Sequence, residues 1–238
     1  MIDLKYQTFE KIKVARPVDR IHFITNYCSN KVVLDIGCFD ETAIKAKVNT
    51  KFWLHGKIAQ SAKKIIGIDN SKLIPKEGLE ISGSHIFKSD ALNITPQIIN
   101  KENYDVIVAG EFIEHLESAS QFLKKIKKDF SKTSKKRFLV ISTPNGNSFL
   151  NTFMGLFSRE VQHQDHLSVF TYKILNSLCT QGRFKSWQII PYKFTSSEMK
   201  LSSKGIKYFS ISLFEKCINL IEYLFPLLST GYIVVIDI

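Results

Sequence analysis

The stretch Val32-Val33-Leu34-Asp35-Ile36-Gly37-Cys38 decides the fold class of this 238-residue chain. Four apolar residues surround a single acid, which is typical of a strand buried on both faces in a parallel sheet. Gly37 then ends the strand, and a residue without a Cβ lets the backbone approach a ligand closely. Further short apolar runs follow at residues 65–69, 85–87, 104–109 and 138–142.

The segments between these runs predict helices. The candidates are residues 53–64, a short piece after Ser71, and residues 118–130. Strands that alternate with helices indicate an α/β fold in which helices cover both faces of a parallel sheet. The less regular second half predicts a helix at 170–180, a strand at 187–194, an apolar helix at 207–228 that Pro226 interrupts, and a last strand at 231–236.

The composition excludes several classes of protein. With 44% hydrophobic and 23% charged residues the chain can bury a full core, which excludes a disordered chain. Its four cysteines form no C-x-x-C pair, which excludes a zinc ribbon or a dense disulfide scaffold. Residues 1–13 carry charges throughout, so no signal peptide is expected, and no run reaches the ~18 apolar residues of a spanning helix. We therefore expect a cytoplasmic protein.

Acidic residues mark the ends of the predicted strands. Asp35 belongs to the first strand, Asp69-Asn70 closes the second, Asp90-Ala91 follows the third and Glu111 follows the fourth. Because the carboxyl ends of parallel strands meet at one edge of a sheet, these side chains are expected to lie together in a ligand site. The acid after the second strand is placed to accept hydrogen bonds from ribose hydroxyls. Each acid alone is more often a turn former or a helix cap.

These motifs resemble those of class I S-adenosylmethionine-dependent methyltransferases over roughly residues 31–145. The run 33–38 is similar to the family's first motif, Asp69 to its ribose-binding acid and Asp90-Ala91 to its adenine-side motif. The resemblance implies a doubly wound, mostly parallel seven-stranded sheet with an antiparallel last strand, and S-adenosyl-L-methionine as cofactor. We expect one methyltransferase domain over 1–238, with a helical lead-in at 1–30, a cofactor-binding half at 31–145 and an acceptor and lid half at 146–238 that contains the apolar helix at 208–228.

The resemblance also implies which residues bind the cofactor. Phe52-Trp53-Leu54-His55 resembles a glycine-poor branch in which a Trp-Leu-His opens the first helix. In that branch His55 would help to hold the methionine carboxylate at the helix N-terminus. The alternative is that Trp53 and His55 only pack the helix onto the sheet. The expected cofactor-binding residues are Asp35, Gly37, His55, Asp69, Asn70, Asp90, Ala91 and Glu111.

Two positions depart from the family pattern. Phe39 and Glu41 stand where the first motif usually continues with glycines that let the loop lie against the cofactor. Their bulk and negative charge favour a second interpretation, in which the chain is a catalytically inactive methyltransferase-like scaffold or subunit. Side chains of Phe39 and Glu41 that fill the cofactor cleft would support that interpretation.

Two histidines are the candidate catalytic residues. The run 110–117, with Glu114-His115-Leu116, and the corner at 142–145 are similar to branches of the family that methylate small metabolites, lipids or glycans, as is the segment 163–170. A hydroxyl acceptor must lose its proton, and histidine is the usual base. His115 and His166 are therefore the predicted bases for transfer to oxygen. The common alternative is a histidine of the surface or core, and no metal site is expected.

The formal net charge of +11 bears on the acceptor. Most of the basic residues are lysines, which read nucleic acid less specifically than arginine does. The fourth strand also lacks the Asn/Asp-Pro-Pro-aromatic corner of amino-methylating nucleic-acid enzymes. We therefore expect a small-molecule, lipid-linked or glycan acceptor and no nucleic acid, with an RNA methyltransferase as a less favoured interpretation.

Two features offer contact with a partner surface. Eight basic residues fall between Lys124 and Arg137, and residues 208–228 combine an apolar face with charged positions. Basic charge beside an apolar helix face is typical of peripheral contact with the inner face of a membrane. The alternatives are solvated lysines for the first feature, and a core helix or a homodimer seam for the second.

Overall fold

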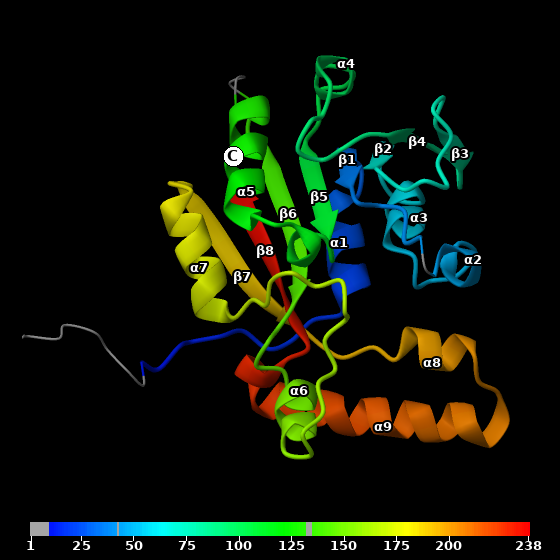
Figure 1. Cartoon of the computed structure of the whole chain (residues 1–238), viewed down its shortest axis with the longest axis vertical. Coiled ribbons are helices and arrows are strands. Elements are labelled where there is room, and N and C mark those ends of the chain that lie inside the picture. The colour runs from blue at the N-terminus through cyan, green and yellow to red at the C-terminus, as the bar shows by residue number, and fades with distance from the viewer. Residues whose placement is uncertain (1–9, 42, 132–134) are drawn as a thin grey trace, which may run out of the picture.

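The computed structural model describes residues 10–41, 43–131 and 135–238 (Figure 1). Residues 1–9 of the predicted helical lead-in lie outside the described residues. Within the rest of it, helix α1 (Arg20–Cys28) begins where the Asp19 carboxylate accepts a hydrogen bond from the backbone N–H of His22 at 2.9 Å. Residues 10–17 form no helix, so the described part of the lead-in is helical only over α1.

A single sheet with the strand order β3-β4-β2-β1-β5-β6-β8-β7 forms the centre of the described structure. β4, β2, β1, β5 and β6 are parallel, and β8 is antiparallel to both of its neighbours. The expected doubly wound sheet with an antiparallel last strand is thereby confirmed. The strands are β1 (Val32–Ile36), β2 (Lys64–Asp69), β3 (Leu79–Ile81), β4 (Ser84–Lys88), β5 (Val106–Gly110), β6 (Phe138–Pro144), β7 (Ser186–Tyr192) and β8 (Gly231–Asp237).

The sheet has eight strands in the described residues where the sequence predicts seven. The additional strand, β3, lies at one edge and pairs antiparallel with β4. Ser82 and Gly83 join the two strands, and both have positive φ (50° and 74°), as a tight two-residue hairpin turn requires. Three residues are too few to show the alternation by which a strand is identified, which is why the pattern does not predict β3.

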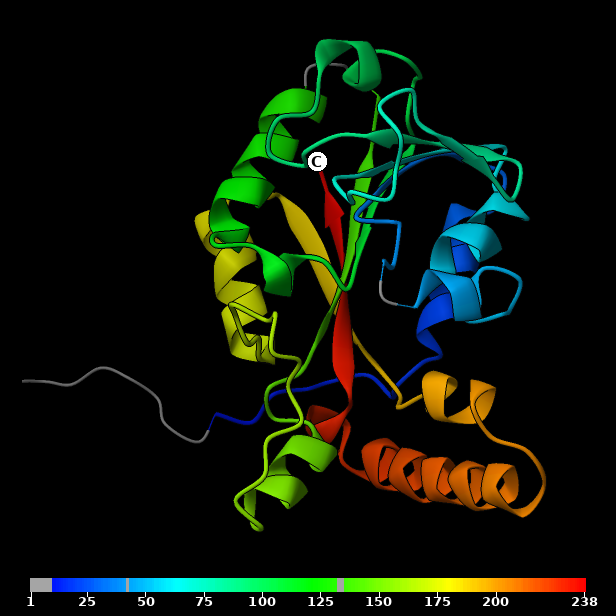
Figure 2. The same cartoon turned by 45° about the vertical axis from the view of Figure 1, so that its right-hand side comes forward.

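Helices cover both faces of the sheet (Figure 2). α5 and α7 pack through residues such as Phe122 and Leu175 on one face, while α1 and α3 pack through Ile24 and Ile58 on the other. The helices after α1 are α2 (Ile44–Lys47), α3 (Leu54–Ala59), α4 (Pro96–Ile99), α5 (Ala119–Phe130), α6 (Phe149–Gly155), α7 (Tyr172–Gln181), α8 (Ser197–Leu201) and α9 (Gly205–Leu224), with short 3-10 turns at Ile113–His115 and Pro226–Leu228.

Two helix predictions differ from the structure. The helix predicted at 53–64 ends earlier, as α3, because the chain enters β2 at Lys64. The short helix predicted after Ser71 is a turn, in which the Asp69 carboxylate accepts from the N–H of Ser71 and the Ser71 hydroxyl accepts from the N–H of Leu73. Side chains that bond to nearby backbone in this way favour turns over helices.

The register of the central strands brings their carboxyl ends to one edge. Asp35 of β1 lies beside Gly67 of β2 on one side and Val108 of β5 on the other. The loops that follow these parallel strands therefore open at the same edge. Figure 1 shows this edge toward the lower end of the molecule, where α6, α8 and α9 lie. None of the helices in the described part of the chain is long and apolar enough to cross a bilayer.

The basic cluster between Lys124 and Arg137 lies apart from α9 (Figures 1 and 2). Lys132 lies outside the described residues. The end of α5 and the start of β6 lie at the opposite end of the molecule from α9 (Figures 1 and 2). Much of the cluster is also engaged within the chain: Lys125 pairs with Asp129, Lys135 with Asp105 and Lys136 with Asp237, while Lys127 and the buried Arg137 donate to backbone carbonyls.

Glu222 fastens α9 to the rest of the fold. Its carboxylate accepts hydrogen bonds from the backbone N–H of Phe194 at 2.8 Å and from the Thr230 hydroxyl at 2.7 Å, and the residue is only 1% exposed. Burial raises the pKa of Glu222 from 4.5 to about 7. The folded protein thus holds a proton that the unfolded chain releases, and its stability falls as the pH rises through this interval.

We expect Glu222→Gln to remove this pH dependence. At about 1.4 kcal/mol per pKa unit, the wild-type carboxylate lowers the free energy of unfolding by at most about 3 kcal/mol between about pH 5 and pH 8. Thermal unfolding of both proteins across this range should show the melting temperature of Glu222→Gln rising relative to wild type with pH. The prediction is wrong if the difference between the two melting temperatures stays constant.

Glu215→Gln is the matched control. Burial raises the pKa of Glu215, but hydrogen bonds from Lys200 and Ser196 outweigh it and the net shift is downward. The carboxylate therefore stabilises the fold above its unfolded pKa and loses that contribution as the pH falls. Because this loss occurs below the ordinary pKa of 4.5, the difference in melting temperature between Glu215→Gln and wild type should stay constant between about pH 5 and pH 8.

Candidate active site

A cleft of about 1100 Å³ opens at the carboxyl edge of the parallel strands. Its walls come from the loops after β1, β2, β4 and β5, and α8 and α9 close one side. The structure brings all ten predicted site residues to this cleft: Asp35, Gly37, His55, Asp69, Asn70, Asp90, Ala91, Glu111, His115 and His166.

The backbone after β1 requires glycine. Gly37 has φ of +67°, and a Cβ at this position would lie 2.3 Å from Cδ2 of Phe112. Its N–H donates to the carbonyl of Ile68 at 2.9 Å, which ties the loop to the neighbouring strand β2. The loop can therefore line the cleft with bare backbone, as expected from the sequence.

Asp35 and His55 form a buried pair beneath this loop. Nδ1 of His55 lies 2.9 Å from Oδ2 of Asp35, and Nε2 lies 2.7 Å from the Ser84 hydroxyl, which itself donates to the carbonyl of Ile81. Asp35 and His55 are 2% and 1% exposed. Because both ring nitrogens of His55 have partners within the chain, its geometry fits the orientation of Asp35 better than a bond to a cofactor carboxylate.

Asp69 organises the loop on the second side of the cleft. One carboxylate oxygen accepts from the N–H of Phe39 and the other from the N–H of Ser71, each at 2.9 Å. Burial raises the pKa of Asp69, and the hydrogen bonds oppose the rise. Asn70 follows it on the cleft wall. The carboxylate thus links the loops after β1 and β2 at the wall of the cleft.

Asp90 and Ala91 lie after β4. The Asp90 carboxylate accepts from the N–H of Leu92 at 2.9 Å and from the Asn93 amide at 2.7 Å, which forms a turn at the cleft wall. Asp90 is exposed, whereas Ala91 is buried. The pair therefore offers a carboxylate at the rim and a small apolar surface beside it.

Phe39 and Glu41 leave the cleft open. Phe39 is 8% exposed and packs in a small apolar cluster that includes Trp53 and Ile74. Glu41 lies at the rim, where its carboxylate accepts from the Ser71 hydroxyl at 2.5 Å. The side chains of Phe39 and Glu41 therefore do not fill the cleft in the way that would support an inactive scaffold.

Glu111 lines the cleft in a strained conformation. Its φ is +52°, which is costly for a residue with a side chain. Its Oε1 accepts from the Tyr192 hydroxyl at 3.0 Å and lies 3.8 Å from the Arg20 guanidinium. These contacts hold the carboxylate over the end of β5, and backbone strain of this kind is concentrated at functional sites.

Glu114 is a buried acid with one unsatisfied oxygen. Its Oε2 accepts from the Thr143 hydroxyl at 2.9 Å, while Oε1 has no hydrogen-bond partner among the described residues. Burial, with a smaller contribution from the charge of Glu111, raises the pKa of Glu114 to about 8. Its backbone carbonyl accepts from Leu167 and Ser168, so Glu114 also fixes the segment that carries His166.

His115 and His166 meet in the same part of the cleft. Their ring centroids are 4.8 Å apart. Nδ1 of His115 lies 3.2 Å from the carbonyl of Asp165 and Nδ1 of His166 lies 3.1 Å from Oε1 of Gln162, so each Nδ1 can donate and leave Nε2 free to accept. Burial and the neighbouring His115 lower the pKa of His166, which favours the neutral imidazole that a base requires.

The same cluster could hold a cation. One ligand atom from each of Glu114, His115 and His166 lies within 4.8 Å of the others. A second group, Asp35, Cys38 and His55, meets the same criterion but is fully buried, and its Asp35 and His55 are already joined by a hydrogen bond. The first group therefore fits a metal better, although the sequence gives no metal-ligand spacing.

Sequence reasoning missed Arg20 and Tyr192. Arg20 opens α1, far from the strand ends in sequence, and nothing in the pattern places it over the cleft. Tyr192 ends β7, and its side chain is buried against the backbone of Gly231, where a Cβ would lie 2.2 Å from the ring. Only knowledge that β7 runs in the direction of β6 would have placed Tyr192 at this edge.

Comparisons with known proteins agree with the architecture. No family model matches the sequence, and no curated protein matches it. Among solved structures, a SAM-dependent methyltransferase from Archaeoglobus fulgidus aligns with a TM-score of 0.53 and 18% identity over 91% of this chain and 90% of its own. The chain has the class I methyltransferase fold.

Two further structures show the range of proteins with this fold. A SAM-dependent methyltransferase from Thermotoga maritima, described as a possible histamine N-methyltransferase, has a TM-score of 0.54 at 15% identity over 91% of this chain and 86% of its own. The small RNA methyltransferase HEN1 has a TM-score of 0.55 at 16% identity over 95% of this chain but 26% of its own. The structural likeness establishes the methyltransferase fold, but sequence identities this low do not identify the substrate.

We expect Gly37→Ala to destabilise the protein by more than about 3 kcal/mol, because positive φ costs about 1 kcal/mol and the new Cβ also collides with Phe112. Gly83→Ala is the matched control: Gly83 has φ of +74° but no atom within 4 Å of a Cβ. Its cost should be the backbone term alone, about 1 kcal/mol. Urea unfolding of both variants measures the difference, and equal losses would contradict the close contact at Gly37.

Proposed function

We propose that the chain is an S-adenosylmethionine-dependent methyltransferase that methylates an oxygen of a small-molecule, lipid-linked or glycan acceptor. One observation carries the proposal: a single cleft joins the acidic strand ends, where this fold would hold a nucleoside, to a histidine pair with free Nε2 atoms. These groups lie at the carboxyl edge of the parallel strands, which is where open α/β sheets bind ligands.

The residues present fit S-adenosylmethionine. Gly37 lines the cleft without a side chain, so a ligand can lie close to its backbone. Asp69 and Asp90 offer carboxylates for hydroxyl and amino groups, and Ala91 offers a small apolar surface for a base. When bound, the cofactor supplies a methyl group on a positively charged sulfur, which leaves as a neutral thioether.

The chain's own residues would align the acceptor and accept its proton. His115 and His166 line the same cleft as Glu111, and a neutral imidazole there can take a proton from a hydroxyl. Tyr192 and Arg20 hold the Glu111 carboxylate in place. Groups fixed in this way lower the barrier mainly by positioning, since a displacement at carbon needs little other assistance.

A nucleic-acid acceptor fits this cleft less well. Acidic side chains such as Asp19, Asp40 and Asp165 line it beside its lysines, so the wall does not form the continuous basic surface that phosphates need. HEN1 shares the fold, but the likeness extends to about a quarter of its length. We therefore propose a small or lipid-linked acceptor over RNA.

We expect S-adenosylhomocysteine to bind with micromolar-range affinity, and Asp69→Asn to weaken binding by about tenfold or more. An amide at position 69 cannot accept from both Phe39 and Ser71, so it loses a loop contact together with the negative charge. Isothermal titration calorimetry measures the effect. Absence of heat with the wild-type protein would favour the inactive scaffold.

Asp105→Asn is the matched control for this measurement. The Asp105 carboxylate also accepts a backbone hydrogen bond, from Val32 at 2.8 Å, but it lies at the amino end of the strands. The substitution removes the same charge and disturbs the same kind of contact. S-adenosylhomocysteine affinity should be unchanged in this variant, and an equal loss would make the Asp69 effect a general one.

A metal titration decides between a base and a cation at the histidine pair. Under the proposed base role, Mn²⁺ titrated into protein freed of metal by dialysis should give no stoichiometric heat at neutral pH. The specific alternative rests on Oε1 of Glu114, a buried oxygen without a partner. Glu117→Gln, on the exposed side of the same loop, is the control. Stoichiometric heat that disappears in Glu114→Gln but persists in Glu117→Gln would show that the histidine pair binds a cation and does not act as a base.

A further inference from the structure

Helix α9 presents its apolar residues outward and its acids inward. Its only acidic residues, Glu215 and Glu222, both lie against the fold, where they accept hydrogen bonds from Ser196 and Phe194. Just three of its residues are buried, and Glu222 is one of them. A surface helix normally has the opposite arrangement, with polar residues toward water.

The outward residues of α9 form a continuous apolar seam. They recur at intervals of three and four positions, which places them on one side of a helix over about 27 Å. The most exposed of the large residues among them are Ile206, Phe209 and Leu220, with exposed fractions of 87%, 69% and 60%. The seam consists of Ile206, Phe209, Leu213, Cys217, Leu220 and Leu224.

Helix α6 and the turn after it add to this surface. α6 packs against α9, and the two lie together at the lower end of the molecule (Figures 1 and 2). The rings of Phe149, Phe153 and Phe157 succeed one another at 5.7 and 5.4 Å, and Leu156 and Phe157 are among the most exposed apolar residues of the protein. Scattered exposed apolar residues are ordinary, but a contiguous set on two adjacent helices marks an interaction site.

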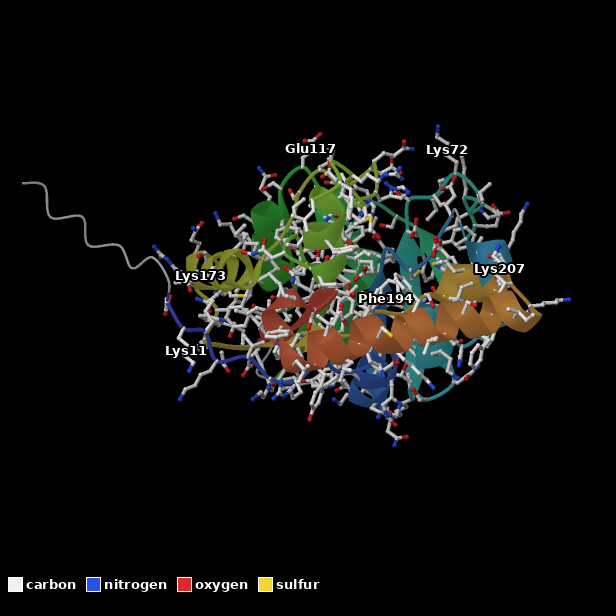
Figure 3. All side chains as sticks on the ribbon, turned by 90° about the horizontal axis from the view of Figure 1, so that it is seen from below. Lys11, Lys72, Glu117, Lys173, Phe194 and Lys207 are labelled. Atoms are coloured by element: carbon white, nitrogen blue, oxygen red, sulfur yellow. The ribbon has the colours of Figure 1, made fainter. Side chains whose placement is uncertain are left out.

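The charges around the seam are positive. Lys216 lies along one side of it, one turn from Leu220, and Lys207 lies on the other side. Neither lysine forms an ion pair with any residue in the described ranges. α6 carries no acidic residue, and the acids of α9 face inward. Viewed from below, α9 crosses the face of the molecule with Lys207 near its end (Figure 3).

We propose that the α6–α9 surface binds the interface of an anionic lipid bilayer. Apolar side chains that enter the headgroup region, flanked by lysines that meet anionic headgroups, are the requirements for such binding. A second copy of the chain fits less well, because a two-fold interface pairs the patch with itself. A two-fold pair would bring together two patches that carry lysines, whereas anionic lipids supply the complementary charge.

The surface adjoins the candidate active site. Lys200 of α8 and Glu215 of α9 line the cleft, and the outward side of α9 carries the seam. Docking through the seam therefore holds the cleft close to the lipid headgroups. The lipid contact itself does not depend on methyl transfer, so it can be tested without cofactor or acceptor.

The test is co-sedimentation of the full chain with vesicles. We expect the protein to bind vesicles of phosphatidylcholine with about one third phosphatidylglycerol, and to bind pure phosphatidylcholine more weakly. Leu213→Glu with Leu220→Glu should reduce binding by more than about tenfold, because two charges then enter the apolar seam. Lys207→Ala and Lys216→Ala should each reduce binding to the anionic vesicles by about fivefold.

Leu73→Glu is the matched control. The exposed fraction of Leu73 is 56%, which is similar to the 60% of Leu220, but Leu73 lies in the turn after β2 and not on the seam. Its substitution should leave vesicle binding unchanged. Light scattering of the same proteins measures their molar mass in solution and so reports whether a second copy of the chain covers the surface. Two outcomes overturn the proposal: wild-type protein that binds neither vesicle, or a dimer that Leu220→Glu dissociates while vesicle binding is absent.

Discussion

The parallel register of β1 between β2 and β5 is the constraint on which the cleft depends. It sets Asp35 beside Gly67 and Val108, so three strands of the sheet end at the same level. Strands buried on both faces tolerate no slip, because a shift of one residue would turn Asp35 from its pairing with His55 into the core. Loops of different length and composition can then vary at one edge without altering the sheet that holds them.

The polar groups of the cleft are oriented largely by the chain itself. Asp69 accepts two backbone N–H groups, His55 joins Asp35 to Ser84, and Glu111 is held by Tyr192. Each bond removes rotational freedom before any ligand arrives, so less entropy is lost on binding. The raised pKa of Glu114 shows the cost of this arrangement, since its carboxyl is removed from water with one oxygen unsatisfied.

Much of the sheet and the cleft could be predicted from the sequence because strand ends are local features. Asp35, Asp69 and Glu111 each stand at the end of an apolar run, and parallel topology brings such ends together. The orientation of α9 could not be predicted, since its buried side is chosen by partners such as Phe194, distant in sequence and invisible to periodicity. The contribution of Arg20 was missed for the same reason.

One feature of α9 gives the molecule a property of practical value. Of its four cysteines, Cys28, Cys38 and Cys179 are buried, and burial raises the pKa of Cys28 and Cys179 to about 12 and that of Cys38 far above its ordinary value. Thiols in that state react slowly, because the thiolate is the nucleophile. Cys217 alone is exposed, midway along the apolar seam. A polarity-sensitive dye attached to this sulfur would therefore report, without any engineering of the chain, when water leaves the surface around it.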